Sequence, residues 1–155
     1  MTSFDICLLL WATHNKRIQK VFASMEGPNF ERPIIPGGNS PSWILGHLVD
    51  TDDALLEILG IGPRLYPDLA KIYHDDPSTN QNGHLDSGEL QKCWKAILAR
   101  MDEVTKGWTE NEWLGRHTLV SEEDFKKEPH RNKLNVMLSR VTHKASHLGQ
   151  IAMMK

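Results

Sequence analysis

Four long segments with helical hydrophobic periodicity constrain the fold of this chain more than any other feature. In each segment, apolar side chains recur three and four residues apart, which places them on one face of an α-helix. Because no segment alternates convincingly as a β-strand, we expect an all-α, antiparallel four-helix bundle. The length of 155 residues fits a single domain over residues 1–155. The expected helices run from about Ser3 to Met25, from Ser40 to Leu59, from Asp86 to Gly107, and from just after Pro129 to Lys155.

The residues that flank these segments support their boundaries. Ser40 precedes a proline, a pairing that is typical of a helix start. Asp86 and Glu89 have the spacing of a capping box. Three connections are longer than the roughly 2–8 residues usual in helical bundles, so we expect them to be partly structured: residues 27–39, 61–85 and 108–128.

Composition excludes several classes of partner. The chain has 18 basic and 20 acidic residues, and it has no basic stripe of the kind that binds nucleic acid. No apolar run approaches the roughly 18–20 residues of a membrane span, and the first residues lack the pattern of a secretory signal. Cys7 and Cys93 form neither a CxxC pair nor a disulfide framework. We therefore expect a cytoplasmic protein without nucleic-acid or membrane partners. The nitrogen ligands of any bound metal would have to come from the eight histidines.

His143 and His147 are the strongest candidates for metal ligands. Their separation of four residues places both imidazoles on one helix face, where they can bind the same ion. A catalytic metal usually has a third protein ligand, and His47 in SWILGHLVD is the best donor on another helix. Three imidazole ligands suit zinc, nickel or iron, and they leave coordination positions of the ion open for water or substrate. The alternative is that these are exposed or partly packed histidines without a metal.

The last helical segment has two different faces. At about 100° per residue, the histidine pair lies opposite an apolar row formed by Leu134, Val141, Leu148 and Ala152. The histidine face therefore borders a cleft, a subunit partner or solvent. A metal in a cleft fits this pattern better than a metal on the bundle axis.

Three phrases of the sequence resemble the DinB-like superfamily of metal-dependent proteins. SWILGHLVDTDDAL is followed much later by VTHKASHLGQI, which contains the H-x-x-x-H-x-G-Q pattern of that superfamily, and LLLWATHNKRI is similar to the first helix of its members. Lys144 is a departure, because an acidic residue often stands at its position.

The resemblance implies a four-helix bundle, often dimeric, that binds one divalent ion through His47, His143 and His147. Zinc or nickel is the favoured ion, with iron as an alternative. Some members are transferases or isomerases that use low-molecular-weight thiols such as mycothiol or bacillithiol, and others are described as hydrolases. The implied partners are therefore a small-molecule substrate, a low-molecular-weight thiol as a candidate cosubstrate, and a second copy of the chain in a homodimer.

Three further residues are candidates for the surroundings of the metal. His14 lies in the apolar stripe of the first segment, where a core histidine with one hydrogen bond is expected and a pocket-lining role is the alternative. Asp50 is placed to accept the second N–H of a ligand histidine, although a solvated face shared with Asp52 and Asp53 is favoured. Gln150 would bind substrate or metal-bound water, or lie at an interface. The remaining histidines lie in the connections and are expected to be exposed: His74, His84, His117 and His130. For His117, which is near Trp113, a place at the edge of the cleft is the alternative.

Two hypotheses of different classes follow from these patterns. The first is a metal-dependent enzyme of the DinB-like type, which activates water or a thiol as a hydrolase, transferase or isomerase. The second is a non-catalytic helical binding protein, or a stress-related dimer in which the histidine face forms the interface. The residue patterns identify no catalytic base.

Overall fold

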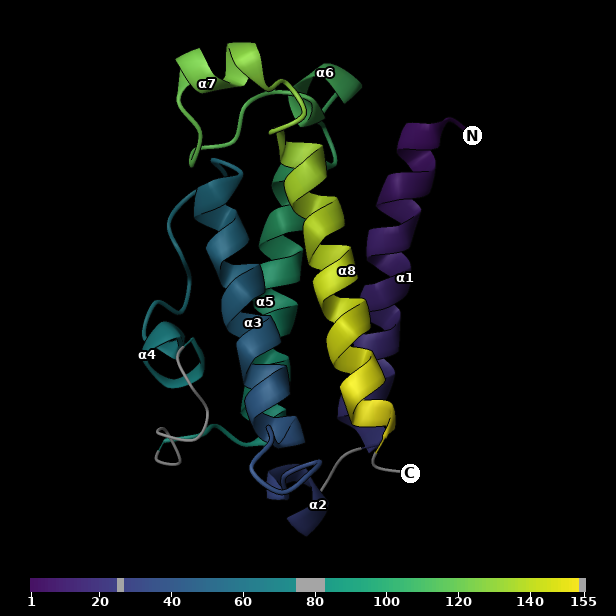
Figure 1. Cartoon of the computed structure of the whole chain (residues 1–155), viewed down its shortest axis with the longest axis vertical. Coiled ribbons are helices and arrows are strands. Elements are labelled where there is room, and N and C mark those ends of the chain that lie inside the picture. The colour runs from purple at the N-terminus through teal and green to yellow at the C-terminus, as the bar shows by residue number, and fades with distance from the viewer. Residues whose placement is uncertain (25–26, 75–82, 154–155) are drawn as a thin grey trace.

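Four long helices form the body of the molecule and confirm the predicted all-α bundle (Figure 1). The computed structural model describes residues 1–24, 27–74 and 83–153. The predicted helix ends at Met25 and Lys155 lie outside these residues. The long helices are α1 (Ser3–Ser24), α3 (Pro41–Ile58), α5 (Ser87–Thr105) and α8 (Lys133–Ala152).

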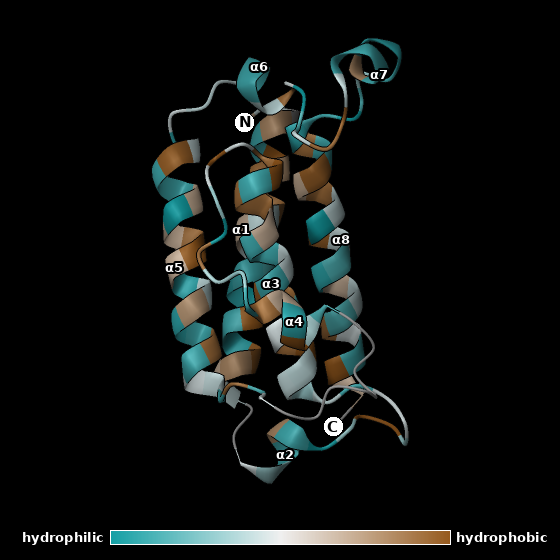
Figure 2. Cartoon of the chain, turned by 90° about the vertical axis from the view of Figure 1, so that its left-hand side faces the viewer, coloured by the Kyte–Doolittle hydropathy of each residue, from teal (hydrophilic) through white to brown (hydrophobic). Residues whose placement is uncertain are grey.

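The helix starts follow from local side-chain hydrogen bonds. Ser40 Oγ accepts a hydrogen bond of 3.2 Å from the N–H of Trp43. Asp86 and Glu89 form the predicted capping box, in which each side chain accepts from the backbone N–H of the other residue. These bonds satisfy N–H groups that have no partner within the helix. Figure 2 shows hydrophobic and hydrophilic residues alternating around the long helices, as their periodicity predicts.

The long helices form two parallel pairs. Helices α1 and α8 run from the upper to the lower end of Figure 1, whereas α3 and α5 run in the opposite direction. The most extensive packing is within these pairs, so the antiparallel contacts lie between them. Because α5 runs parallel to α3, the chain must return along the bundle after α3 ends. Residues 59–74 and 83–86 are the described parts of the connection that contains this return, and the need for a return explains the length of the connection.

Short helices occupy the long connections, as expected. They are α2 (Pro28–Glu31), α4 (Leu69–Tyr73), α6 (Glu110–Trp113) and α7 (Glu122–Lys127). Helices α2 and α4 pack against α3. Part of the predicted connection 61–85 lies outside the described residues. Among the described residues, no helix combines the length and the apolar character of a membrane span.

The structure overturns the expectation that Asp50, Asp52 and Asp53 share a solvated face, because all three are completely buried. Asp53 accepts hydrogen bonds of 2.8 and 2.9 Å from the backbone N–H groups of Leu65 and Tyr66. The chain after α3 therefore folds back over this face of the helix. Hydrophobic periodicity does not predict such a cover, since the covering segment supplies polar groups.

Two of the four histidines that were expected to be exposed are also covered. His74 and His130 are exposed, but the His84 side chain is only 14% exposed and His117 is buried. His84 Nδ1 lies 3.1 Å from Ser42 Oγ at the start of α3, and His117 Nδ1 accepts from the N–H of Leu119. Both positions lie in connections that pack on the bundle, which polar neighbours in the sequence do not reveal.

A buried ion pair links the four long helices. Lys144 Nζ on α8 lies 2.6 Å from Asp52 Oδ2 on α3 and donates at 2.6 Å to Asn15 Oδ1 on α1. Trp94 on α5 donates its indole N–H to the same Asp52 oxygen at 2.7 Å. The ammonium also lies 3.4 Å from the ring centroid of Trp11. One polar cluster thus contacts every long helix.

The partners of Lys144 compensate for the burial of its charge. Burial lowers the pKa of the ammonium, and the Asp52 carboxylate opposes that shift. Removing one member of such a pair leaves an uncompensated charge in the core. Lys144 therefore has a structural role in this chain.

We expect Lys144→Met to destabilise the protein by about 3–5 kcal/mol, because the Asp52 carboxylate would lose its cation. Urea unfolding followed by circular dichroism measures the change. The double variant Lys144→Met, Asp52→Asn should recover part of the loss, since an amide oxygen can still accept from Trp94. As a control, Lys127→Met removes an exposed ion pair with Glu123 and should cost less than about 1 kcal/mol. Equal losses in the free energy of unfolding for Lys144→Met and Lys127→Met would contradict a structural role of the buried pair.

Candidate metal centre

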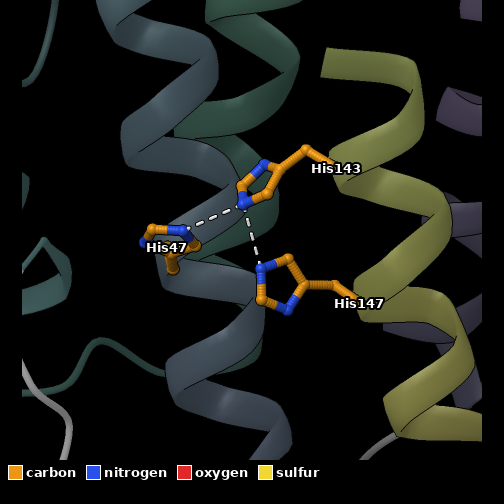
Figure 3. Close-up of side chains that lie close together, drawn as sticks. All are labelled: His47, His143 and His147. Atoms are coloured by element: carbon orange, nitrogen blue, oxygen red, sulfur yellow. Dashed lines mark hydrogen bonds between the residues drawn. The ribbon is translucent and has the colours of Figure 1, made fainter. Parts of the chain in front are cut away.

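His47, His143 and His147 lie together between α3 and α8 (Figure 3). The Nε2 atom of His143 is 3.1 Å from His47 Nε2 and 3.0 Å from His147 Nε2. All three side chains are half-buried. His143 and His147 share one face of α8, as their spacing predicted, and His47 on α3 lies against that face.

Two contacts hold the His47 ring. Its Nδ1 lies 2.8 Å from the backbone carbonyl oxygen of Tyr73 in α4, and the Trp43 indole stacks on it with ring centroids 4.9 Å apart. A carbonyl oxygen can only accept, so Nδ1 carries the proton and Nε2 has a free lone pair. This fixes which nitrogen faces the other two histidines.

Gln150 orients His147 in the same way. Its Oε1 atom accepts a hydrogen bond of 2.7 Å from His147 Nδ1, which again leaves Nε2 as the free nitrogen. Outer contacts of this kind are typical of metal-ligating histidines, whose second nitrogen donates to a fixed acceptor. Gln150, predicted to bind substrate or lie at an interface, here contacts a candidate ligand.

His143 completes the group with its Nε2 atom. Within the described residues, its buried Nδ1 has no hydrogen-bond partner. Without an ion, His143 Nε2 can donate its single proton toward the lone pairs of His47 and His147. A cation would accept all three Nε2 lone pairs with the single ring proton of His143 on Nδ1 instead of Nε2. The donor set therefore fits a metal ion.

Electrostatics keep the group neutral. Burial lowers the pKa of each of the three histidines. For His143 the pKa falls to about 4, because His147, His47 and Arg140 add like-charge repulsion to the effect of burial. Neutral imidazole is the form that binds metals, so the site is in its ligating form at neutral pH.

The distances match a metal centre with nitrogen ligands. At Zn–N distances of about 2.0–2.1 Å, tetrahedral ligand atoms lie about 3.3 Å apart. The three candidate ligand atoms all lie within 4.8 Å of one another. In the part of the chain that the structure describes, this is the one group of three such side chains with that property. Three protein ligands leave open positions for water or substrate.

The other predicted residues lie outside this group. His14 is buried, and its Nδ1 lies 3.0 Å from the Leu10 carbonyl oxygen, so the expected core role is confirmed. Asp50 does not accept the predicted N–H of His47, which is bonded to the Tyr73 carbonyl; it forms an ion pair of 2.7 Å with Arg64 and lies 3.3 Å from His74 Nδ1.

Sequence reasoning missed the role of Tyr73. It acts through its backbone carbonyl, which carries no side-chain signature, and the position of α4 within its connection was not predicted. Arg140 lies three residues before His143 on the same helix, and its positive charge contributes to the lowered pKa of that histidine. Its spacing was a usable signal, since residues three apart are neighbours on a helix.

Gly46 allows α4 to approach α3 beside the histidines. A Cβ atom at this position would overlap the buried Tyr73 ring, which packs directly on the helix backbone. The Tyr73 hydroxyl accepts from the Leu85 N–H at 2.7 Å, so the ring is held at both ends. The absence of a side chain at residue 46 therefore helps to position the carbonyl that holds His47.

We expect Gly46→Ala to destabilise the protein by about 1–3 kcal/mol, because the Tyr73 ring must move to admit the methyl group. The matched control is Gly149→Ala on α8, where a Cβ meets no heavy atom within 4 Å; it should stabilise the helix by up to about 1 kcal/mol. Chemical denaturation of both variants measures the difference. If Gly46→Ala left the free energy of unfolding unchanged, the contact with Tyr73 would not require a glycine at this position.

Comparison with family models confirms the resemblance seen in the sequence. The model of the DinB superfamily matches residues 10–151, which include all three histidines. No curated protein matches the chain significantly. Because the family match extends over most of the chain, this chain belongs to the DinB superfamily.

Proposed function

We propose that this protein is a divalent-metal-dependent enzyme in which His47, His143 and His147 hold one ion. The observation that carries the proposal is the convergence of three Nε2 atoms, with two of the rings held through Nδ1 by Tyr73 and Gln150. A hydrogen bond from the second ring nitrogen, which fixes the orientation of the ring, is typical of metal-ligating histidines. Membership of the DinB superfamily is compatible with the same function.

The ion would supply Lewis acidity for the activation of a water molecule or a low-molecular-weight thiol, in hydrolysis or in thiol transfer or isomerisation. An all-nitrogen donor set favours zinc or nickel, with iron as a third candidate. The chain itself keeps the imidazoles neutral through burial and fixes their orientation. Trp43 covers one face of His47 and limits access of water from that side.

We also propose a small-molecule substrate and a homodimer in the cytoplasm. Support for the dimer comes from α1, where Ile6, Leu9 and Leu10 share one helix face and are exposed. Apolar residues grouped in this way are typical of contact surfaces.

Zinc binding tests the site directly. Chelator-treated protein titrated by calorimetry should bind one zinc ion per chain with a Kd below about 1 μM, equivalent to roughly 8 kcal/mol. The double variant His143→Ala, His147→Ala should lose this binding, since one histidine remains. His130→Ala removes an exposed histidine elsewhere and should bind as the unchanged protein does. Equal, sub-stoichiometric zinc in the unchanged protein and the double variant would contradict the proposal.

The pH dependence of zinc binding has a defined direction. Lowered histidine pKa values mean that the neutral, ligating forms persist below the usual value of 6.5. We therefore expect the zinc affinity to fall less between pH 7.5 and 6.0 than it would for three histidines with the ordinary pKa of 6.5, while His143 stays neutral down to its pKa of about 4. Calorimetry at each pH measures this. A steep loss of affinity between pH 7 and 6 would indicate ordinary, exposed imidazoles.

A non-catalytic binding protein is the second candidate, and a separate cavity favours it. This cavity of about 300 Å³ is lined largely by apolar side chains, including Trp11, Trp108, Trp113 and Met137. Its volume is at the lower end of the range for small-molecule sites. An absence of zinc binding in the titration above would favour this function.

A further inference from the structure

A cavity of about 280 Å³ lies between the start of α3 and the end of α8. Its lining is mainly aliphatic, with Ile34 and Ile35 from the connection before α3, Ile44 from α3 and Met153 after α8. Gln150 is a polar member of the lining. Pockets that are mostly apolar with a few placed polar groups are typical of small-molecule sites.

Two structural links connect this cavity to the candidate metal centre. Gln150 belongs to both, because it lines the cavity and also accepts the hydrogen bond from His147 Nδ1. Ile44 lies one turn before His47 on α3, as Gln150 lies one turn after His147 on α8. Since α3 and α8 run in opposite directions, both positions are one turn nearer to the same end of the bundle. The cavity is therefore adjacent to the centre along the seam of these two helices.

The cavity has a buried floor and an exposed apolar rim. Ile44 is completely buried, whereas Ile35 is 55% and Met153 is 71% exposed. The loop that carries Ile35 is closed by a hydrogen bond of 3.0 Å from the Ile34 N–H to the Asn39 carbonyl oxygen. Large exposed aliphatic side chains at a cavity mouth would lose contact with water when an apolar ligand enters, which favours binding.

Gln150 also provides a polar group for a ligand. Its Oε1 atom is engaged by His147, but within the described residues the amide nitrogen has no hydrogen-bond acceptor. Its two N–H groups are therefore available to an acceptor atom between the cavity and the histidines. A carbonyl or ether oxygen next to an apolar substituent has the matching chemistry.

We propose that this cavity binds an alkyl or aryl substituent of the substrate, whose reacting group lies at the three histidines. The volume is sufficient, since apolar cavities of roughly 150 Å³ admit a benzene ring. Gln150 connects the two parts by orienting His147 and donating to the polar atom beside the substituent. The proposal rests on the proposed function for the reacting end, but the cavity can be tested separately.

Two metal-binding probes that differ only in their apolar tails test the proposal on zinc-loaded protein. Hexanohydroxamate carries four more methylene groups than acetohydroxamate, and each buried methylene contributes roughly a fourfold gain in affinity. With part of the tail left in the open mouth, we expect hexanohydroxamate to bind at least about tenfold more tightly. Calorimetry measures both affinities.

The rim residues provide the matched variants. Ile35→Asp, Met153→Asp should reduce the preference for hexanohydroxamate to less than about threefold, while zinc stoichiometry and the affinity for acetohydroxamate stay unchanged. Both positions are exposed, so the fold should tolerate them. Leu119→Asp changes a side chain that is 69% exposed and lies outside the cavity, and it should keep the full preference. Equal affinities of the unchanged protein for the two hydroxamates would overturn the proposal.

A second measurement separates the cavity from the metal. Chelator-treated protein with labelled isoleucine and methionine methyl groups is titrated with 1-hexanol, and the Ile44 and Met153 signals should shift. If zinc does not bind but these signals shift, the proposed function fails and the cavity remains a site for apolar groups. If zinc does not bind and the signals stay unshifted, both proposals are overturned.

Discussion

The buried pair of Lys144 and Asp52 is the interaction on which the arrangement of the four long helices depends. Its oxygen and ammonium atoms are 2.6 Å apart and have further partners on α1 and α5. A buried charge tolerates little displacement from its counter-charge, because water is not available to replace a lost contact. The pair therefore specifies one register of α8 against α3 more strictly than aliphatic side chains would.

The candidate metal centre follows from that register. Lys144 and His143 are consecutive on α8 and have different partners on α3, the first the buried Asp52 and the second the half-buried His47. Asp52 and His47 lie on the same helix, so the pair that aligns α8 with α3 also aligns the imidazoles. The histidines lie on a helix seam and not on the bundle axis, which agrees with the opposition between the histidine face and the apolar row of α8.

Much of this architecture could be predicted, for physical reasons that also explain the failures. Helical periodicity, the Ser40 cap and the Asp86 capping box depend on residues that are close together in the sequence. They can therefore be predicted from it. The pairing of His143 with His147 is likewise local. The burial of Asp53 and the role of the Tyr73 carbonyl depend on how distant segments fold back over α3, and neither leaves a periodic signal. The parallel course of α3 and α5 was also not predictable, since hydrophobic periodicity does not indicate in which direction a helix runs relative to its neighbours.

The separation of the histidines along the chain has a consequence for the order of folding. His143 and His147 come together as soon as α8 forms, but His47 is 96 residues from His143. Closing so long a loop is entropically costly and slow compared with forming one helix. A nascent α8 can thus hold an ion with two ligands, while the third ligand is added only when α8 docks on α3. An ion bound by all three would link α8 to α3 and stabilise the packing of these two helices through mass action.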